Sequence, residues 1–150
     1  MNHPIPVVTC TIYRGDKFLV IRRWDGAKKF GGHWGFPGGK VDPDETIAGA
    51  LKREVFEETS LELEDKFLLI DSYYYEGSLG LHFAVYATSE DVHCLEGYEY
   101  RWLSSLDELQ KLKRIPGIDY HIVKGTELLK QQGPFLSLKA VDYVPEKYIN

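Results

Sequence analysis

Three glutamates, Glu54, Glu57 and Glu58, stand at a spacing that gathers carboxylates on a helix. At about 100° per residue, their side chains fall within an arc of roughly 100° on one helix face. The apolar residues Ile47 and Leu51 point close to the same arc, so the carboxylates continue the stripe that faces the protein body. Clustered anions repel one another, and partial burial adds a desolvation cost unless cations compensate. The spacing therefore indicates a site for divalent metal.

The metal that suits such a site is Mg²⁺, with Mn²⁺ as a substitute. Glutamate oxygens are hard ligands for these ions, which keep positions open for water and phosphate oxygens. The chain has a formal net charge of -5, so binding a phosphate substrate would need cations to bridge like charges. The alternative is an acidic helix end exposed to solvent, although carboxylates are unfavourable near the negative end of a helix dipole. The three glutamates alone leave both interpretations open.

The surrounding residues favour the metal site. Residues 39 to 61 read GKVDPDETIAGALKREVFEETSL and resemble the box of the Nudix hydrolase family: glycine, five residues, glutamate, seven residues, Arg-Glu, an aliphatic, any residue, Glu-Glu. The positions that match at fixed spacing are Gly39, Glu45, Arg53, Glu54, Val55, Glu57 and Glu58. So many matches rarely coincide by chance. The GFPGG segment at 35 to 39 is also similar to the family's usual approach to the box.

The resemblance implies a role for each matching residue. The implied metal ligands are Glu54, Glu57, Glu58 and the carbonyl of Gly38. Arg53 would orient a neighbouring carboxylate, Glu45 would support the site, and Gly39 would belong to the substrate-binding set. Glu54, Arg53 and Glu57 are the candidate catalytic residues of the box. The alternatives are a surface salt bridge for Arg53 and turn geometry alone for the two glycines.

One position departs from the family pattern. The family has glycine two residues after Glu58, where this chain has Ser60. That glycine is expected to end the helix in a left-handed conformation, and serine there costs up to about 1 kcal/mol. The exact end of the helix is therefore open, but Ser60 replaces no implied metal ligand.

Two segments outside the box supply further candidates. Glu96 and Glu99 lie in LEGYEYRW, which is similar to a segment where some relatives place another carboxylate for metal binding or general-base work. Glu96 is the preferred candidate catalytic residue of the two. Arg23, in VIRRW, matches a position where similar enzymes contact substrate phosphate, and Arg22 should point to the opposite side of the strand. For each of these candidates, the alternative is an ordinary solvated charge.

Several aromatic residues and histidines allow more than one interpretation. The candidates for stacking a nucleobase are Tyr73, Tyr74, Tyr75 and Trp102. Aromatic strand residues more often belong to the core or its rim, and we favour that interpretation. His33 and His82 have no metal-ligand spacing to a second histidine, so we interpret them as structural or surface groups.

The elements that position these residues follow from the pattern of side chains. Runs rich in Val, Ile, Thr and aromatic residues predict strands at 6–13, 17–24, 67–75, 81–88 and 98–103. Helices are predicted at 46–59, after Ser105, and at 119–131, and Asp44 is a plausible N-cap for the first. The glycine-rich stretch 25–45 predicts a long functional loop. This order predicts an α/β fold, a Nudix-type α/β/α sandwich with a mixed central sheet, in one domain spanning residues 1–150.

Composition narrows the partners. The net negative charge of the chain disfavours non-specific electrostatic binding to the phosphate backbone, so nucleic acid is an unfavoured partner. Nowhere do about 18 apolar residues run together, so we expect no membrane insertion and assign a cytoplasmic location by default. Cys10 and Cys94 are predicted to be free thiols. The sequence is compatible with a homodimer but does not determine the oligomeric state.

The function implied by the resemblance is metal-dependent hydrolysis of a phosphoanhydride in a small nucleotide-like substrate. A nucleoside triphosphate that yields nucleoside monophosphate and pyrophosphate is the leading candidate. ADP-ribose and dinucleotides remain alternatives, because the box reports diphosphate chemistry and not the attached group. A module that binds a nucleotide without turnover is the rival from another class, and the intact box argues against it.

Overall fold

The computed structural model describes residues 3–94, 98–131 and 136–137. Within these ranges, eight strands form one mixed sheet. The strands are β1 (Ile5–Arg14), β2 (Lys17–Arg22), β3 (Trp34–Gly35), β4 (Gly38–Lys40), β5 (Leu63–Tyr75), β6 (Ser78–Ala87), β7 (Glu99–Leu103) and β8 (Leu136–Ser137). The main path through the sheet is β3-β2-β1-β6-β5-β8, with β4 paired to β1 and β7 paired to β2.

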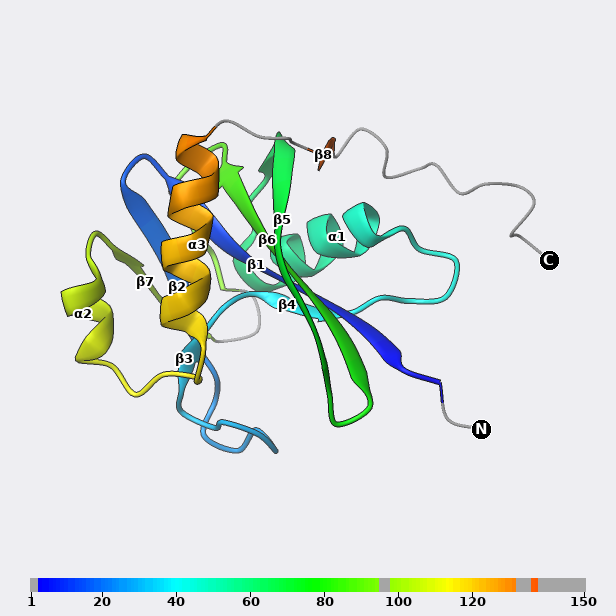
Figure 1. Ribbon diagram of the computed structural model, residues 1–150. Coiled ribbons are helices and arrows are strands. Elements are labelled where there is room, and N and C mark those ends of the chain that lie inside the picture. Colours follow the sequence, from blue (N-terminus) through cyan, green and yellow to red (C-terminus); the bar gives the residue numbers. More distant parts are fainter. Residues whose placement is uncertain (1–2, 95–97, 132–135, 138–150) are drawn as a thin grey trace.

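Helices cover both faces of this sheet. Helix α1 (Ile47–Thr59) lies behind it in the view of Figure 1, and α3 (Ile118–Lys130) lies in front. The short helix α2 (Leu106–Gln110) follows β7 at one side of the molecule. The predicted α/β fold with a mixed sheet between helices is therefore confirmed.

Strand β1 organises the centre of the sheet. It forms an antiparallel hairpin with β2 and pairs in parallel with β6 from Ile5 to Tyr13. Its other edge changes partner: Val7 to Thr9 pair with β4, whereas Tyr13 and Arg14 pair with β2. Gly38, the partner of Thr9, therefore lies where the β4 pairing ends.

Each face of the sheet has its own hydrophobic cluster. On the α1 side, β1 residues alternate into a cluster that contains Val8, Cys10, Ile12, Leu51 and Val55. On the α3 side, the cluster contains Tyr13, Val20, Ala84, Ile118 and Ile122. Because α1 packs against the sheet through Leu51 and Val55, the other residues on that helix face also point towards the strands.

The structure shows which residues cap the two ends of α1. The prediction of Asp44 as N-cap is wrong: Thr46 caps the helix, because its extended backbone lets its side chain accept a hydrogen bond from Gly49 N. Asp44 instead has a left-handed backbone with φ of 65° in the preceding turn. At the other end, Ser60 adopts the left-handed conformation expected of the family glycine, with φ of 62°. Its hydroxyl donates to His93 O at 2.9 Å.

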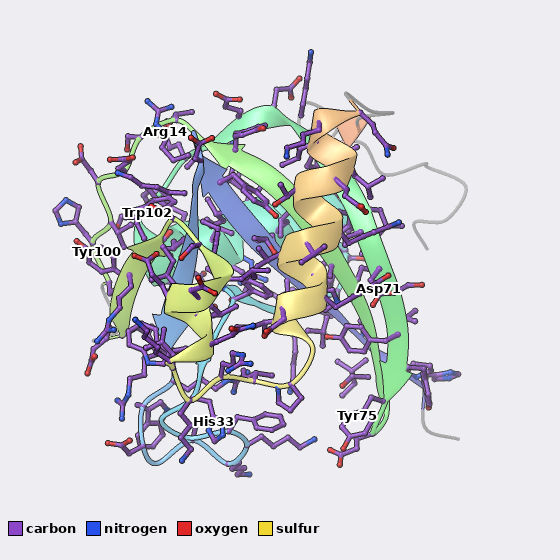
Figure 2. All side chains as sticks on the ribbon, turned by 60° about the vertical axis from the view of Figure 1, so that its left-hand side comes forward. Arg14, His33, Asp71, Tyr75, Tyr100 and Trp102 are labelled. Atoms are coloured by element: carbon purple, nitrogen blue, oxygen red, sulfur yellow. The ribbon has the colours of Figure 1, made fainter. Side chains whose placement is uncertain are left out.

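The glycine-rich loop is held against the far end of the sheet. Lys29 forms an ion pair with Glu76, and its ammonium group lies 5.5 Å from the centre of the Tyr75 ring. Figure 2 accordingly shows His33, in the loop, and Tyr75, at the tip of β5, at the same end of the molecule. Although this loop was predicted without strands, it contains the short strands β3 and β4.

Both cysteines are free thiols, as predicted. Cys10 is completely buried, and burial raises its pKa well above the usual value. Across the described ranges, no helix is both long enough and apolar enough to cross a membrane.

Candidate active site

Helix α1 brings its glutamates onto the glycine pair of β4. The carboxyl group of Glu54 lies so close to Gly39 that any side chain at that position would collide with it. Gly38 N donates a hydrogen bond to Glu58 Oε1 at 3.3 Å. Gly38 has φ of 158°, and a side chain there would collide with the Val8 carbonyl oxygen. The two glycines therefore allow the closest approach between the helix carboxylates and the sheet.

Arg53 joins the box residues into one network. Its guanidinium donates to Glu45 from Nε at 2.7 Å and from Nη2 at 2.9 Å. Nη1 donates to Glu54 at 2.9 Å and to Glu57 at 3.3 Å. A further bond from Nη2 reaches the Lys40 carbonyl oxygen at 3.1 Å. Arg53 thus contacts three neighbouring carboxylates, and its role in orienting them for catalysis stays a prediction.

The network changes the proton affinity of its members. The hydrogen bonds from Arg53 hold the pKa of Glu45 below its ordinary value. Burial raises the pKa of Glu54, and Arg53 only partly offsets that effect. Glu58 is almost fully buried, and its charge adds to burial in raising the pKa of Cys94. The site is therefore rich in negative charge that is partly removed from water.

The donor chemistry at this position fits a divalent metal ion. Glu54, Glu57 and Glu58 offer hard oxygen atoms, and Glu54 stands where burial disfavours its charged form. In the ranges that the structure describes, no three acidic, histidine or cysteine side chains already converge as a metal-binding group. Arg53 instead supplies the positive charge to Glu54 and Glu57. A metal ion would compete with Arg53 for these two carboxylates.

A cleft of about 170 Å³ opens beside these residues. Arg23, Gly38 and Glu58 all line it, so a phosphate in the cleft could contact the arginine and a box glutamate together. Arg22 points elsewhere, because it forms ion pairs with Asp25 at 2.6 Å and Glu99 at 3.7 Å. The assignment of Arg23 to substrate phosphate stays a prediction.

The structure describes one of the two candidates of the LEGYEYRW segment. Glu99 begins β7, and its side chain is 64% exposed and paired with Arg22. Glu96 lies outside the described residues. Sequence reasoning also missed Trp24, which lines the cleft directly after Arg23. The signal that could have found it was an aromatic residue at the last position of the strand predicted at 17–24, next to a candidate phosphate ligand.

The three tyrosines named from the sequence lie on β5, which β6 separates from β1 and its partner β4. Trp102 lies on β7 and packs against the hydrophobic cluster on the α1 side. Tyr74 and Tyr75 are 66% and 62% exposed near the β5–β6 turn. Tyr73 packs over Gly80. His82 is fully buried, with Nδ1 2.7 Å from Thr9 Oγ1 and Nε2 2.8 Å from Thr11 Oγ1. These contacts make His82 a structural residue of the sheet.

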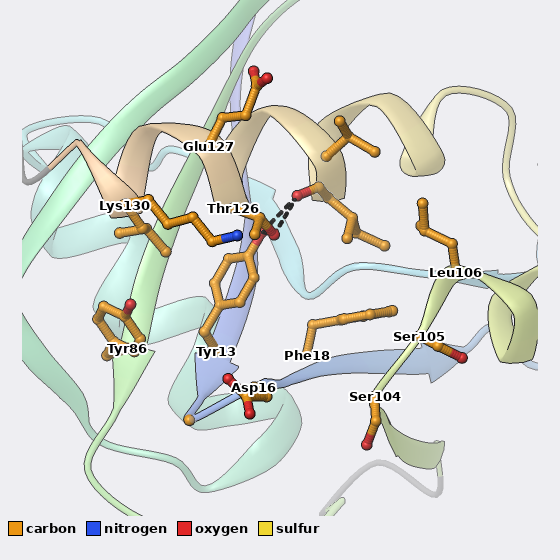
Figure 3. A pocket seen from close by; sticks show the side chains of 14 residues that line it. Tyr13, Asp16, Phe18, Tyr86, Ser104, Ser105, Leu106, Thr126, Glu127 and Lys130 are labelled. Atoms are coloured by element: carbon orange, nitrogen blue, oxygen red, sulfur yellow. Dashed lines mark hydrogen bonds between the residues drawn. The ribbon is translucent and has the colours of Figure 1, made fainter.

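The larger hollow of about 550 Å³ lies on the α3 side of the sheet (Figure 3). Its floor is formed by Tyr13 and Phe18, with Thr126 and Lys130 of α3 along one wall. None of the box glutamates lines it. Size alone therefore does not identify the active site, because Glu58 and Arg23 line the smaller cleft.

Comparison with known proteins agrees with this geometry. The model of the NUDIX domain matches residues 3–124, which is most of the chain. The chain belongs to the Nudix family. It is a Nudix hydrolase, an enzyme that acts on acid anhydrides.

Two curated relatives of this Nudix hydrolase show how far the similarity extends. An 8-oxo-dGTP diphosphatase of Buchnera aphidicola subsp. Schizaphis graminum is 35% identical over 91 residues, which cover 60% of this chain and 68% of that protein. Phosphatase NudJ of Escherichia coli K12 is 30% identical over 69 residues, or 46% of this chain. That second match spans only 43% of NudJ.

Solved structures extend the similarity to the fold. A MutT structure, from a study of Aliivibrio salmonicida and Vibrio cholerae, has a TM-score of 0.67 and 26% identity; it covers 80% of this chain and 94% of its own. A Nitrosomonas europaea NUDIX hydrolase has a TM-score of 0.74 at 20% identity and covers 89% of this chain and 76% of its own. The second likeness concerns the fold alone.

Proposed function

We propose that this Nudix hydrolase cleaves a nucleoside triphosphate into nucleoside monophosphate and pyrophosphate, with Mg²⁺ held by Glu54, Glu57, Glu58 and the Gly38 carbonyl. The observation that carries the proposal is that Arg23, Gly38 and Glu58 line one cleft. A phosphate chain in this cleft would meet an arginine and the acidic helix face at once. The name of one relative, an 8-oxo-dGTP diphosphatase, also supports a nucleotide substrate.

Residues of the chain divide the work of binding and positioning. Arg23 would hold a phosphate oxygen, and Arg53 would fix the orientation of Glu54 and Glu57. The divalent ion, when bound, would neutralise charge on the diphosphate and acidify the attacking water. Gly39 would keep the Glu54 carboxylate against the sheet, because no side chain intervenes. Glu96 remains the proposed candidate for further general-base work.

Product analysis with defined substrates tests the proposal. Purified protein would be incubated in Mg²⁺ with nucleoside triphosphates, ADP-ribose and dinucleotides, and the products would be separated by chromatography. Nucleoside monophosphate and pyrophosphate in equal amounts are expected from the triphosphates. Preferred cleavage of ADP-ribose or a dinucleotide would replace the substrate assignment, and binding of nucleotides without any product would favour the non-catalytic alternative.

The metal assignment has its own tests. Chelation should abolish turnover without unfolding the protein, because α1 packs through its own apolar residues, and Mg²⁺ or Mn²⁺ should restore it. Glu57→Gln should lower kcat by at least about a hundredfold. Its fold should survive, since Glu57 is half-exposed. Glu62→Gln, at an exposed position just beyond the helix, is the matched control. Full activity in protein free of divalent metal would end this mechanism.

A further inference from the structure

Trp24 stands at the cleft but has no part in the phosphate chemistry described above. Its side chain is 63% exposed, and it lines the same cleft as Arg23, Gly38 and Glu58. Exposure alone means little, since single apolar residues are common on protein surfaces. What distinguishes Trp24 is that a large aromatic ring follows directly after the arginine that faces the acidic helix.

The backbone holds this ring in place. Ala27 N donates to the Trp24 carbonyl oxygen at 3.1 Å, which closes a tight turn. The six-membered ring of the indole lies against Gly26, so closely that any side chain at Gly26 would collide with it. On the other side of Trp24 in the chain, Arg23 N donates to His33 O at 2.9 Å. The position of the indole is therefore set before any ligand arrives.

The neighbours of Trp24 in the cleft indicate what the ring would meet. Glu58, Gly38 and Arg23 line the same cleft, where a diphosphate would react and where Arg23 would provide a phosphate contact. Because Trp24 lines that cleft directly after Arg23 in the chain, a group attached to the phosphate would lie within reach of the indole. An indole offers a flat π surface, and flat aromatic rings stack on it whatever their hydrogen-bonding pattern.

Phe36 also lines the cleft, but its ring already packs in a cluster with the rings of His82 and His121. His82 and His121 stack with ring centres 4.1 Å apart and planes inclined by 17°. Phe36 packs on His82 with ring centres 4.8 Å apart. These three rings pack against one another, whereas most of the Trp24 side chain is exposed to solvent. Trp24 is therefore better placed than Phe36 to stack on a ligand ring.

We propose that Trp24 stacks on the aromatic base of the substrate and so selects nucleoside-bearing phosphoanhydrides over bare polyphosphates. The inference rests on the proposed function, because it concerns the base of the proposed nucleotide substrate, which the phosphate-binding residues would not contact. The selection would act on binding, since the ring would contact the base and not the reacting diphosphate.

Tryptophan fluorescence tests the contact directly. The protein, in Mg²⁺, would be titrated with an adenosine triphosphate analogue that carries a methylene group between the α and β phosphorus atoms, and in parallel with inorganic tripolyphosphate. The nucleotide analogue should quench the emission and tripolyphosphate should not. Trp24→Phe should remove the quenching. Trp102→Phe, at a partly buried tryptophan that does not line the cleft, should retain it. Quenching that persists in Trp24→Phe would overturn the inference.

Steady-state kinetics with adenosine triphosphate separate binding from chemistry. Trp24→Ala should raise KM about tenfold, the usual scale for loss of one base–aromatic stack, and should lower kcat by less than that. Gly26→Ala keeps the indole but forces it to move, so it should also raise KM. Tyr74→Ala, at an exposed tyrosine on β5, should change neither value by more than about twofold.

The outcomes distinguish this inference from the proposed function. If the unmodified protein hydrolyses the triphosphate and Trp24→Ala keeps its KM, only the stacking assignment fails. If the unmodified protein hydrolyses no nucleoside triphosphate, the proposed function fails and the inference falls with it. A raised KM together with lost quenching in the Trp24 variants would support both.

Discussion

Arg53 donates a pair of hydrogen bonds to the Glu45 carboxylate, from Nε at 2.7 Å and from Nη2 at 2.9 Å. The remaining nitrogen, Nη1, spans Glu54 and Glu57. A planar guanidinium makes these contacts at once, whereas the ammonium group of lysine cannot match the fork geometry. Arg53 therefore ties the loop before α1 to two of the proposed metal ligands.

Arg53→Lys should keep the charge but lose this alignment. We expect kcat to fall by about tenfold or more and the free energy of unfolding to fall by about 1 kcal/mol, because the paired contact to Glu45 is lost. Steady-state kinetics and urea unfolding would measure the two effects. Lys52→Arg, at the exposed neighbouring position, is the control for a changed cation on the same helix. A kcat within twofold of the original would show that Arg53 does not position the site.

Glu96 and Glu99 can be separated by their effect on rate. Glu99→Gln should change kcat by less than about threefold, because Glu99 is mostly exposed and paired with Arg22. Glu96→Gln should reduce kcat more than KM is changed, and it should flatten the acidic limb of the pH–rate profile if Glu96 is the base. Equal and small effects of both substitutions would assign these glutamates to the solvated surface.

Ser60 offers a test of the left-handed helix end. Glycine relieves the strain of φ at 62° by up to about 1 kcal/mol but loses the Ser60 hydroxyl bond to His93 O, so Ser60→Gly should be close to neutral. Ser60→Ala keeps the strain and loses the bond, so it should destabilise the protein by about 1 kcal/mol. Urea unfolding of both variants gives the comparison. An alanine variant as stable as the glycine variant would contradict the account.

His82 should make stability depend on pH. Burial lowers the pKa of His82 to about 2, from 6.5 in an unperturbed histidine. Protonation below pH 6.5 therefore favours the unfolded chain, and stability is lost as the pH falls, at up to about 1.4 kcal/mol per pH unit. In His82→Gln, the free energy of unfolding should fall less between pH 7 and pH 5 than in the unmodified protein. His93→Gln, at an exposed histidine, should keep the original dependence.

Local periodicity explains why so much of α1 could be predicted. Glu54, Glu57 and Glu58 share a face with Ile47 and Leu51 because 3.6 residues make a turn, and that geometry needs no knowledge of the rest of the fold. The long strands were found from a different local signal, their runs of Val, Ile, Thr and aromatic residues, which form stretches of consecutive buried residues in β1, β2 and β6. Their ends were less accurate: β5 begins at Leu63, not at residue 67.

Features set by distant contacts could not be predicted in this way. Thr46 caps α1 in place of Asp44 because the path of the preceding turn decides which side chain reaches Gly49 N. The short strands β3 and β4 exist only because β2 and β1 pair with them. Trp24 joined the site only through the turn that lays its ring on Gly26.

The parallel pairing of β1 with β6 has a consequence for the way the chain acquires its structure. Tyr13 pairs with Tyr86 in this ladder, so β1 can complete its pairing only after β6, more than 70 residues further along the chain, has been synthesised. Loop closure over such a separation is slow compared with the formation of α1 or of the β5–β6 hairpin. A nascent chain that ends before β6 would hold the glutamate helix with one edge of β1 unpaired. The acidic helix face can therefore reach its final setting only after the second half of the sheet has been synthesised.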